Sequence, residues 1–155
     1  DDCVSIRDGS KILVINGVTC GPGHGISIVS LELFKNEEPV DGVTIKNCTM
    51  TNTSNGVRIK SWPSVETGTC SNIHFEDIIM TNVSSPIIID QKYCPWSKYK
   101  INEESKFKLS NISFKKFTTL LCFQKLSILF AVLLCIVKMW NLLTLKLCTV
   151  DRLDL

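Results

Sequence analysis

The sequence has little excess charge of either sign. Its formal net charge is +2, and the residues up to Phe117 hold 13 Lys and Arg against 13 Asp and Glu. No basic stripe is interleaved with aromatic residues, which argues against a nucleic-acid partner. An anionic ligand must therefore be attracted by locally placed cations. Spacings of the Cys-x-x-Cys or His-x-x-x-His type are also missing, so we expect no metal site and no cofactor.

Sustained helical periodicity of apolar residues is missing as well up to Phe117, so we expect no helices there. Short runs rich in Val, Ile and Thr instead alternate apolar with polar residues, which is typical of β-strands. Gly, Asn, Ser, Asp and Pro, the usual turn residues, separate these runs. The predicted strands are 3–7, 12–16, 26–29, 43–47, 57–60, 73–77, 87–90 and 112–117.

The runs resemble one another at long, regular offsets. Residues 43–60 match residues 73–90 at a constant offset of 30, and residues 110–114 repeat the pattern of residues 71–75. Such repeats predict a solenoid, in which each thin coil buries its apolar face by stacking on the next. We therefore expect an all-β fold, a right-handed parallel β-helix. An antiparallel β-sandwich is the alternative, but few two-residue Asn-Gly turns separate the runs.

Stacking in register would bring distant residues together. Alignment of the apolar positions 4, 26, 57 and 87 places five polar residues on neighbouring strands of one sheet: Asp1, Asp2, His24, Arg58 and Lys60. Two-residue alternation sends Arg58 and Lys60 to the outer face if their neighbours point inward. The same alternation turns Asp2 inward, unless the chain turns sharply ahead of its strand.

Eight cysteines and four Asn-x-Ser/Thr sequons together favour a secreted glycoprotein from an oxidising compartment, although frequent Asn, Ser and Thr also produce sequons. Cys3 and Cys20 both precede strands, and a disulfide between them would contribute roughly 3 kcal/mol by closing a loop of about 15 residues. Cys70 with Cys94 is a second candidate pair among many connectivities. The candidate glycosylation sites are Asn47, Asn52, Asn82 and Asn111.

The composition changes after Phe117. Residues 126–137 form an apolar run bounded by lysines, and this run is shorter than the about 20 residues that a bilayer-spanning helix needs. We therefore divide the chain into residues 1–117, part of a β-helix domain, and residues 118–155, a Leu-rich tail that we expect to be foreign to the fold. A C-terminal membrane anchor is the alternative for the tail.

Three motifs follow one another in a specific order: Asp1-Asp2-Cys3, Gly23-His24-Gly25 and Arg58-Ile59-Lys60. The longer segments around them, such as Cys-Gly-Pro-Gly-His-Gly-Ile-Ser-Ile at 20–28 and Asn-Ile-His-Phe-Glu-Asp-Ile at 72–78, resemble the polygalacturonases. These are pectin-cleaving glycoside hydrolases with a right-handed parallel β-helix fold. The resemblance is greatest to exo-acting plant members and runs from Asp1 to Phe117.

The resemblance implies hydrolysis, with inversion, of α-1,4 links between galacturonic acid units. Inversion needs one carboxylic acid to protonate the leaving oxygen and one carboxylate to activate water. By the family pattern, Asp1 corresponds to the general acid and Asp2 to one of the residues that activate the water. His24 corresponds to the residue that supports the protonation state of the acid. Arg58 and Lys60 correspond to the residues that bind the sugar carboxylate.

The family also has an Asn-Thr-Asp signature whose aspartate shares the activation of water, and the given residues begin after it. We therefore expect this stretch alone to be inactive, as part of a secreted, monomeric cell-wall enzyme that acts on pectin and oligogalacturonides. A membrane partner is expected only if the tail is genuine. The alternative function is a non-catalytic β-solenoid that binds pectin through Arg58 and Lys60.

Overall fold

The computed structural model describes residues 1–31, 37–62, 67–91, 93, 106–120 and 147–154, which contain strands and no helix. Every predicted strand coincides with an observed one. The strands are β1 (Val4–Ile6), β2 (Lys11–Asn16), β3 (Thr19–Cys20), β4 (Ile26–Leu31), β5 (Val40–Thr51), β6 (Asn55–Ser61), β7 (Thr69–Thr81), β8 (Ser85–Asp90), β9 (Lys108–Leu120) and β10 (Leu147–Asp154).

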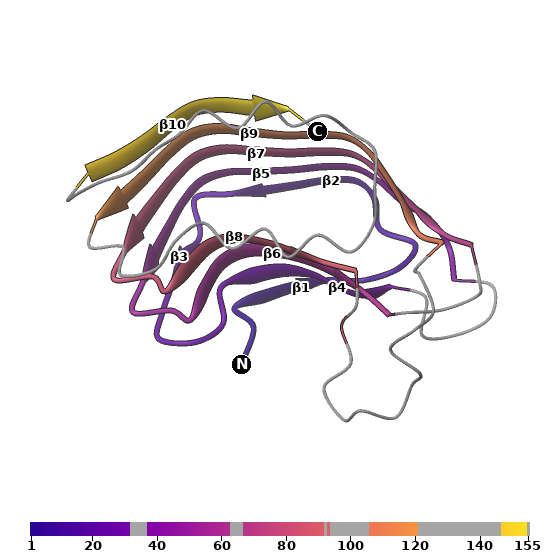
Figure 1. The fold of residues 1–155 in the computed structure, drawn as a ribbon, viewed down its shortest axis with the longest axis horizontal. Coiled ribbons are helices and arrows are strands. Elements are labelled where there is room, and N and C mark those ends of the chain that lie inside the picture. The colour runs from indigo at the N-terminus through magenta and orange to yellow at the C-terminus, as the bar shows by residue number, and fades with distance from the viewer. Residues whose placement is uncertain (32–36, 63–66, 92, 94–105, 121–146, 155) are drawn as a thin grey trace.

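Two sheets face one another across the molecule (Figure 1). The first has the strand order β1-β4-β6-β8, and the second has the order β10-β9-β7-β5-β2 with β3 beside β5. The chain alternates between the sheets, so that β4 with β5, β6 with β7, and β8 with β9 form successive coils. This is a parallel β-helix, and it confirms the solenoid predicted from the repeats.

The predicted register is confirmed strand by strand. Val4 pairs with Ile26, Ile26 with Val57, and Val57 with Ile87 in the first sheet. In the second sheet β5 and β7 pair at an offset of 30 residues, with Val43 opposite Ile73. All of these pairings are parallel, which excludes the antiparallel sandwich for residues 1–120 as far as they are described.

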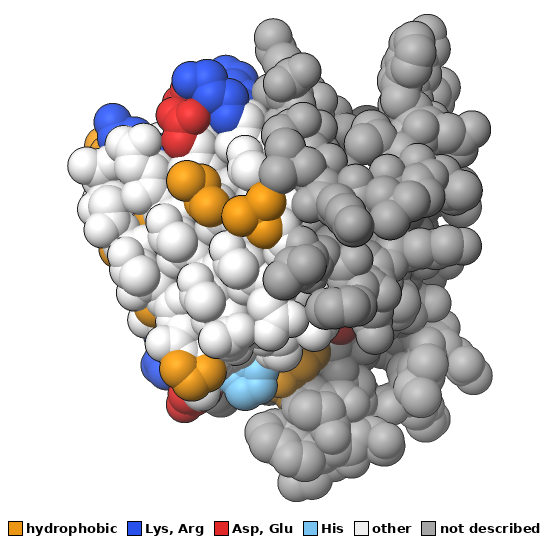
Figure 2. Space-filling model, turned by 90° about the vertical axis from the view of Figure 1, so that its left-hand side faces the viewer, with side chains coloured by type: hydrophobic (Ala, Val, Ile, Leu, Met, Phe, Trp, Pro, Cys, Tyr) orange, Lys and Arg blue, Asp and Glu red, His pale blue; other side chains and the backbone are white. Residues whose placement is uncertain are grey.

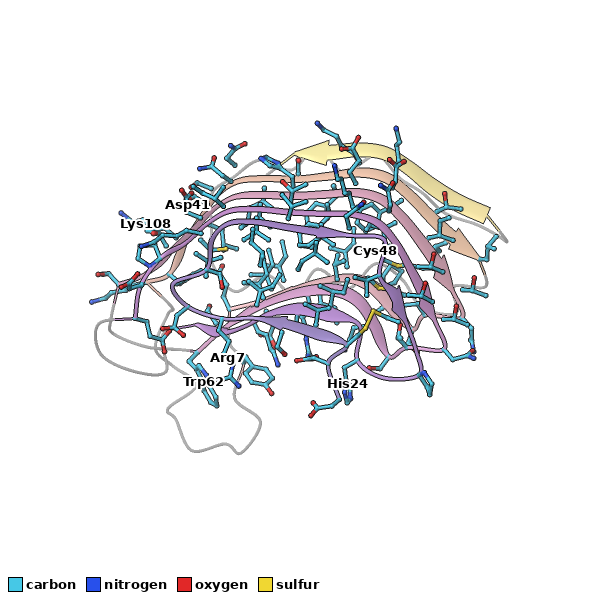
Figure 3. The ribbon with its side chains drawn as sticks, turned by 180° about the vertical axis from the view of Figure 1, so that it is seen from behind. Arg7, His24, Asp41, Cys48, Trp62 and Lys108 are labelled. Carbon is cyan, nitrogen blue, oxygen red and sulfur yellow. A yellow bond between two sulfur atoms is a disulfide. The ribbon has the colours of Figure 1, made fainter. Side chains whose placement is uncertain are left out.

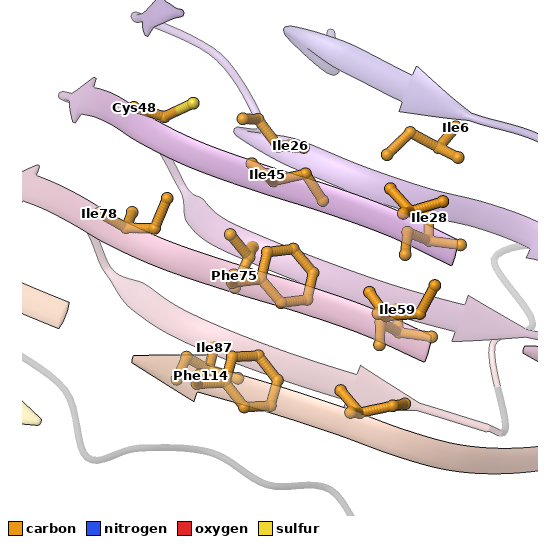
Figure 4. Close-up of a cluster of buried hydrophobic side chains, with 14 of the residues drawn as sticks. Ile6, Ile26, Ile28, Ile45, Cys48, Ile59, Phe75, Ile78, Ile87 and Phe114 are labelled. Carbon is orange, nitrogen blue, oxygen red and sulfur yellow. The ribbon is translucent and has the colours of Figure 1, made fainter. Parts of the chain in front are cut away.

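The core lies between the sheets and consists of apolar ladders (Figure 4). Inward positions of successive coils stack on one another, because parallel strands in register lie about 4.8 Å apart. The rings of Phe75 and Phe114, which are opposite each other in β7 and β9, stack with centroids 5.1 Å apart. Each coil therefore depends on its neighbours for the burial of its apolar face.

The strands of the second sheet are longer than predicted because they continue through sharp bends. At these bends asparagines adopt positive φ, a conformation that this short polar residue tolerates better than most. Their side chains form hydrogen-bonded ladders: Asn47 Nδ2 donates to Asn16 Oδ1 at 2.7 Å, and Asn82 Nδ2 donates to Asn52 Oδ1 at 2.8 Å. Asn111 donates in the same way to the side chain of Asn72.

All four sequon asparagines therefore belong to ladders, and three of them use the amide nitrogen that a glycan would modify. The turns from β5 to β6 and from β7 to β8 lie on the side shown in Figure 2, where the described surface consists mostly of uncharged polar side chains and backbone. Glycosylation of these residues stays a prediction, and backbone conformation gives a second reason for asparagine at each position.

The described part of the tail belongs to the second sheet. β9 continues to Leu120, so the predicted boundary at Phe117 falls inside a strand, and β10 pairs antiparallel with β9. The apolar run 126–137 lies outside the described residues. The part of the chain that is described contains no helix long and apolar enough to span a membrane.

The first predicted disulfide is confirmed, since Cys3 and Cys20 are bonded. Cys70 is a buried free thiol, because its position in β7 directs it into the core. Burial, assisted by the negative charge of Asp41, raises the pKa of the Cys70 thiol to about 12. Cys94, its predicted partner, lies outside the described residues.

The asparagine ladder predicts a difference between two substitutions at Asn47 (φ 52°). Asn47→Ala loses the ladder hydrogen bond and strains the backbone, and should lower the free energy of unfolding by about 2 kcal/mol. Asn47→Gly loses only the hydrogen bond, and should cost about half as much. Denaturant unfolding monitored by circular dichroism measures both.

Both substitutions at Asn47 remove the sequon, so a missing glycan cannot explain a difference between them. Thr49→Ala removes the same sequon while keeping the asparagine, and should change stability by less than about 0.5 kcal/mol. Equal losses for Asn47→Ala and Thr49→Ala would contradict the structural role of the ladder.

Candidate functional site

The candidate site lies on the outer face of the first sheet. Val57 and Ile59 of β6 are 1% and 2% exposed and point into the core. Arg58 and Lys60 alternate with these two residues along the strand and therefore point outward, as predicted. Arg58 is opposite Ser27 of β4, which in turn is opposite Ser5 of β1. His24 and Trp62 lie on this same outer side (Figure 3).

The Asp2 carboxylate is the centre of the polar contacts on this face. Its Oδ1 accepts hydrogen bonds from Ser27 Oγ at 2.9 Å and from Arg58 Nη2 at 2.9 Å. Its Oδ2 accepts one from Ser5 Oγ at 3.3 Å and lies 3.9 Å from Lys60 Nζ. Each carboxylate oxygen thus faces one hydroxyl and one cation.

Strand alternation alone places Asp2 on the wrong side of the sheet. The chain bends at Cys3, ahead of β1, so the inward direction of Val4 does not extend back to Asp2. The disulfide to Cys20 and a hydrogen bond from the Cys3 N–H to the Gly25 carbonyl at 2.8 Å hold this bend. Asp2 could point outward only if the chain turned sharply ahead of β1, and the structure contains this turn.

The turn Gly23-His24-Gly25 packs against the first residues of the chain. The backbone N–H of His24 donates to the Asp1 carbonyl at 3.1 Å, and both side chains are exposed. A Cβ on Gly23 would lie 2.7 Å from that same carbonyl oxygen. Gly25 has φ +77°, and a Cβ there would collide with the carbonyl oxygens of Asn55 and Gly56. Only glycines allow the turn to approach both neighbours.

Lys60 lies beneath an aromatic cover that the sequence did not predict. Its Nζ is 4.5 Å from the centroid of the Tyr93 ring, and the Trp62 ring meets Tyr93 edge-on at 5.4 Å. The Lys60 side chain is only 7% exposed. Burial and the positive charge of Arg58 lower the pKa of Lys60 below its usual value, and the carboxylates of Asp2 and Asp90 offset only part of this effect.

Sequence reasoning thus found Asp2, Arg58 and Lys60, and the structure brings them into contact. It missed the side chains that support them: Ser5, Ser27, Trp62 and Tyr93. The serines could have been found, because they share the outward parity of Arg58 on the aligned strands. Tyr93 could not, since it follows the end of β8. The described residues contain no cluster of three His, Cys, Asp or Glu that could hold a metal ion.

The low pKa of Lys60 predicts that its charge opposes folding. Protonated Lys60 is less favourable in the folded than in the unfolded chain, so its cost is full at neutral pH and is relieved as pH rises through the lowered folded-state pKa. Lys60→Met should therefore stabilise the protein by about 1 kcal/mol at pH 7, and this advantage should shrink as the pH approaches 10.5.

Urea unfolding of Lys60→Met and of the unchanged chain at several pH values measures this difference. Lys108→Met, at an exposed lysine of β9, is the matched control and should show no such pH dependence. Destabilisation by Lys60→Met at neutral pH would mean that its contacts with Asp2 and Tyr93 outweigh the cost of burial.

The chain is similar to known glycoside hydrolases over most of its length. The sequence model described as glycosyl hydrolases family 28 matches residues 1–134. A polygalacturonase of Gossypium barbadense is 70% identical over 115 residues, which cover 74% of this chain and 28% of that protein. An exopolygalacturonase of Oenothera organensis is 56% identical over 115 residues, which cover 74% of this chain and 32% of that protein.

The chain therefore spans about three-tenths of the length of these curated relatives. The family match covers most of its residues. The chain is a member of glycosyl hydrolases family 28.

Proposed function

We propose that the protein to which this chain belongs hydrolyses the α-1,4 links of polygalacturonic acid with inversion, and that Asp1, Asp2 and His24 take part in the reaction. The observation that carries the proposal is the contact between an aspartate and two cations on one outer face, beside the turn that presents His24. The names of the relatives support the same substrate class.

Asp1 is the proposed general acid. Its Oδ1 accepts the backbone N–H of Asp2 at 3.0 Å, so the other oxygen is the one that can carry a proton toward the glycosidic oxygen. The side chain is exposed, which suits contact with a polymer. The backbone N–H of His24 donates a hydrogen bond to the Asp1 carbonyl. The His24 imidazole, held next to Asp1 in this way, is suited to support the protonation state of the acid.

Asp2 is proposed to help activate the water. Its two oxygens are unequally engaged: both contacts of Oδ1 are 2.9 Å, whereas those of Oδ2 are 3.3 and 3.9 Å. Oδ2 is therefore the oxygen that can most easily exchange a contact for a water molecule.

Arg58 and Lys60 are proposed to bind the carboxylate of a galacturonic acid unit. Both are mostly shielded from solvent, so their charges act in a medium less polar than water. Local cations of this kind allow a chain with little net charge to select an anionic polymer. The Cys3–Cys20 disulfide supports a place for the protein outside the cell. The proposed pectic substrate supports a place in the cell wall.

A chimera tests the proposal. The 115 residues that are 70% identical to the Gossypium barbadense polygalacturonase would replace the matching segment of that protein. The chimera should release reducing ends from polygalacturonic acid. Asp1→Asn should lower this rate by about 10³-fold, as expected for the loss of a general acid, and His24→Ala should lower it by about 10²-fold.

Asp77→Asn is the matched control, because it makes the same replacement of aspartate by asparagine in β7 of the opposite sheet. It should leave the rate unchanged. A folded chimera whose activity survives Asp1→Asn would contradict the assignment of the acid. Salt-sensitive retention on pectate without hydrolysis would replace the proposal by the non-catalytic binding function.

A further inference from the structure

Ser27 is a buried serine at the centre of the candidate site. It lies on β4 between Ser5 of β1 and Arg58 of β6, and it is 0% exposed although it points to the outer face. Its Oγ donates to Asp2 Oδ1 at 2.9 Å and accepts from Arg58 Nε at 3.3 Å. A hydroxyl has one donor and two lone pairs, so both bonds form together.

The size of Ser27 matters as much as its hydroxyl. Asp2 precedes β1, and Arg58 is two strands away on β6, about 9.6 Å across the sheet for two strand spacings. Arg58 reaches Asp2 only by extending over the β4 position between them, which Ser27 occupies. A larger side chain at this position would fill the space through which the guanidinium passes.

The two bonds engage one particular edge of the guanidinium. The Nε–H donates to Ser27 and one Nη2–H donates to Asp2, so the side edge of Arg58 grips the two oxygens as it would grip a carboxylate. The end edge, formed by Nη1 and the second hydrogen of Nη2, takes no part in this contact. That edge has the same fork geometry and suits a second carboxylate.

We propose that Ser27 is a positioning residue, which locks the side edge of Arg58 against Asp2 and thereby offers the end edge to the carboxylate of a galacturonate ligand. The ligand in this statement rests on the proposed function, whereas the orientation of Arg58 does not. Ser27 also connects the proposed base to the proposed substrate-binding cation, so that neither can rotate without the other.

The first experiment is NMR of the full chain without a ligand. The sequence has only three arginines, so the Nε–H resonance of Arg58 is assigned by its loss in Arg58→Lys. Ser27→Ala removes one oxygen atom and should shift this resonance and speed its exchange with water by about tenfold, because its acceptor is lost. A resonance unchanged by Ser27→Ala would overturn the positioning role.

Ser71→Ala is the matched control. Ser71 Oγ donates to Asp41 Oδ1 at 2.6 Å in the second sheet, so this variant also removes a serine hydroxyl bonded to an aspartate. It should lower thermal stability to a similar degree and leave the Arg58 resonance in place. If Ser71→Ala moves that resonance equally, the effect of Ser27→Ala is a general loosening and the inference fails.

The second experiment measures binding of trigalacturonic acid to the full chain by isothermal titration calorimetry. Ser27→Ala should weaken binding by about tenfold, and by no more than about twofold in an Arg58→Lys background, since Ser27 acts through Arg58. Equal losses in both backgrounds would overturn the inference. If the unchanged chain fails to bind, the proposed substrate fails, and the NMR result still decides the role of Ser27.

Discussion

The whole site depends on parallel strands stacked in register. β1, β4 and β6 lie side by side in one sheet, so residues separated by 56 positions in the chain meet across two strand spacings. Arg and Lys are the side chains long enough to cross that distance, and Asp2 is where they arrive. A slip of one residue in β6 would turn Arg58 and Lys60 into the core.

The apolar ladders beneath the site make this register stable. Each inward residue is covered by the equivalent residue of the next coil, and the stacked rings of Phe75 and Phe114 belong to the same arrangement. Against that rigid base, the site holds a lysine that burial makes harder to protonate. The lowered pKa of Lys60 predicts that its charge costs stability, which is common where a charge serves binding or chemistry.

The corners of the coils place a different demand on the chain. Positive φ at repeated positions favours asparagine, and stacking allows the side-chain amides to bond from one coil to the next. A sequon results where a Ser or Thr stands two residues after such an asparagine, as Thr49, Ser54, Ser84 and Ser113 do. The pattern that suggests a glycoprotein thus also arises from the geometry of the solenoid.

By itself, the sequence determined the repeats and the alternation along each strand, because these follow from local patterns and from a simple count between coils. The bond between Cys3 and Cys20 was one candidate pairing among many, and the structure decided it. The sequence motifs also predicted Asp2, Arg58 and Lys60, which the structure brings into contact. Only the tertiary structure decided that Asp2 points outward, since a bend at Cys3 interrupts the alternation. Tyr93 over Lys60 was likewise decided by packing, which depends on side-chain contacts that no periodicity records. The outward direction of Ser27 follows from the alignment of the strands, but its hydrogen bond to Asp2 depends on the bend at Cys3.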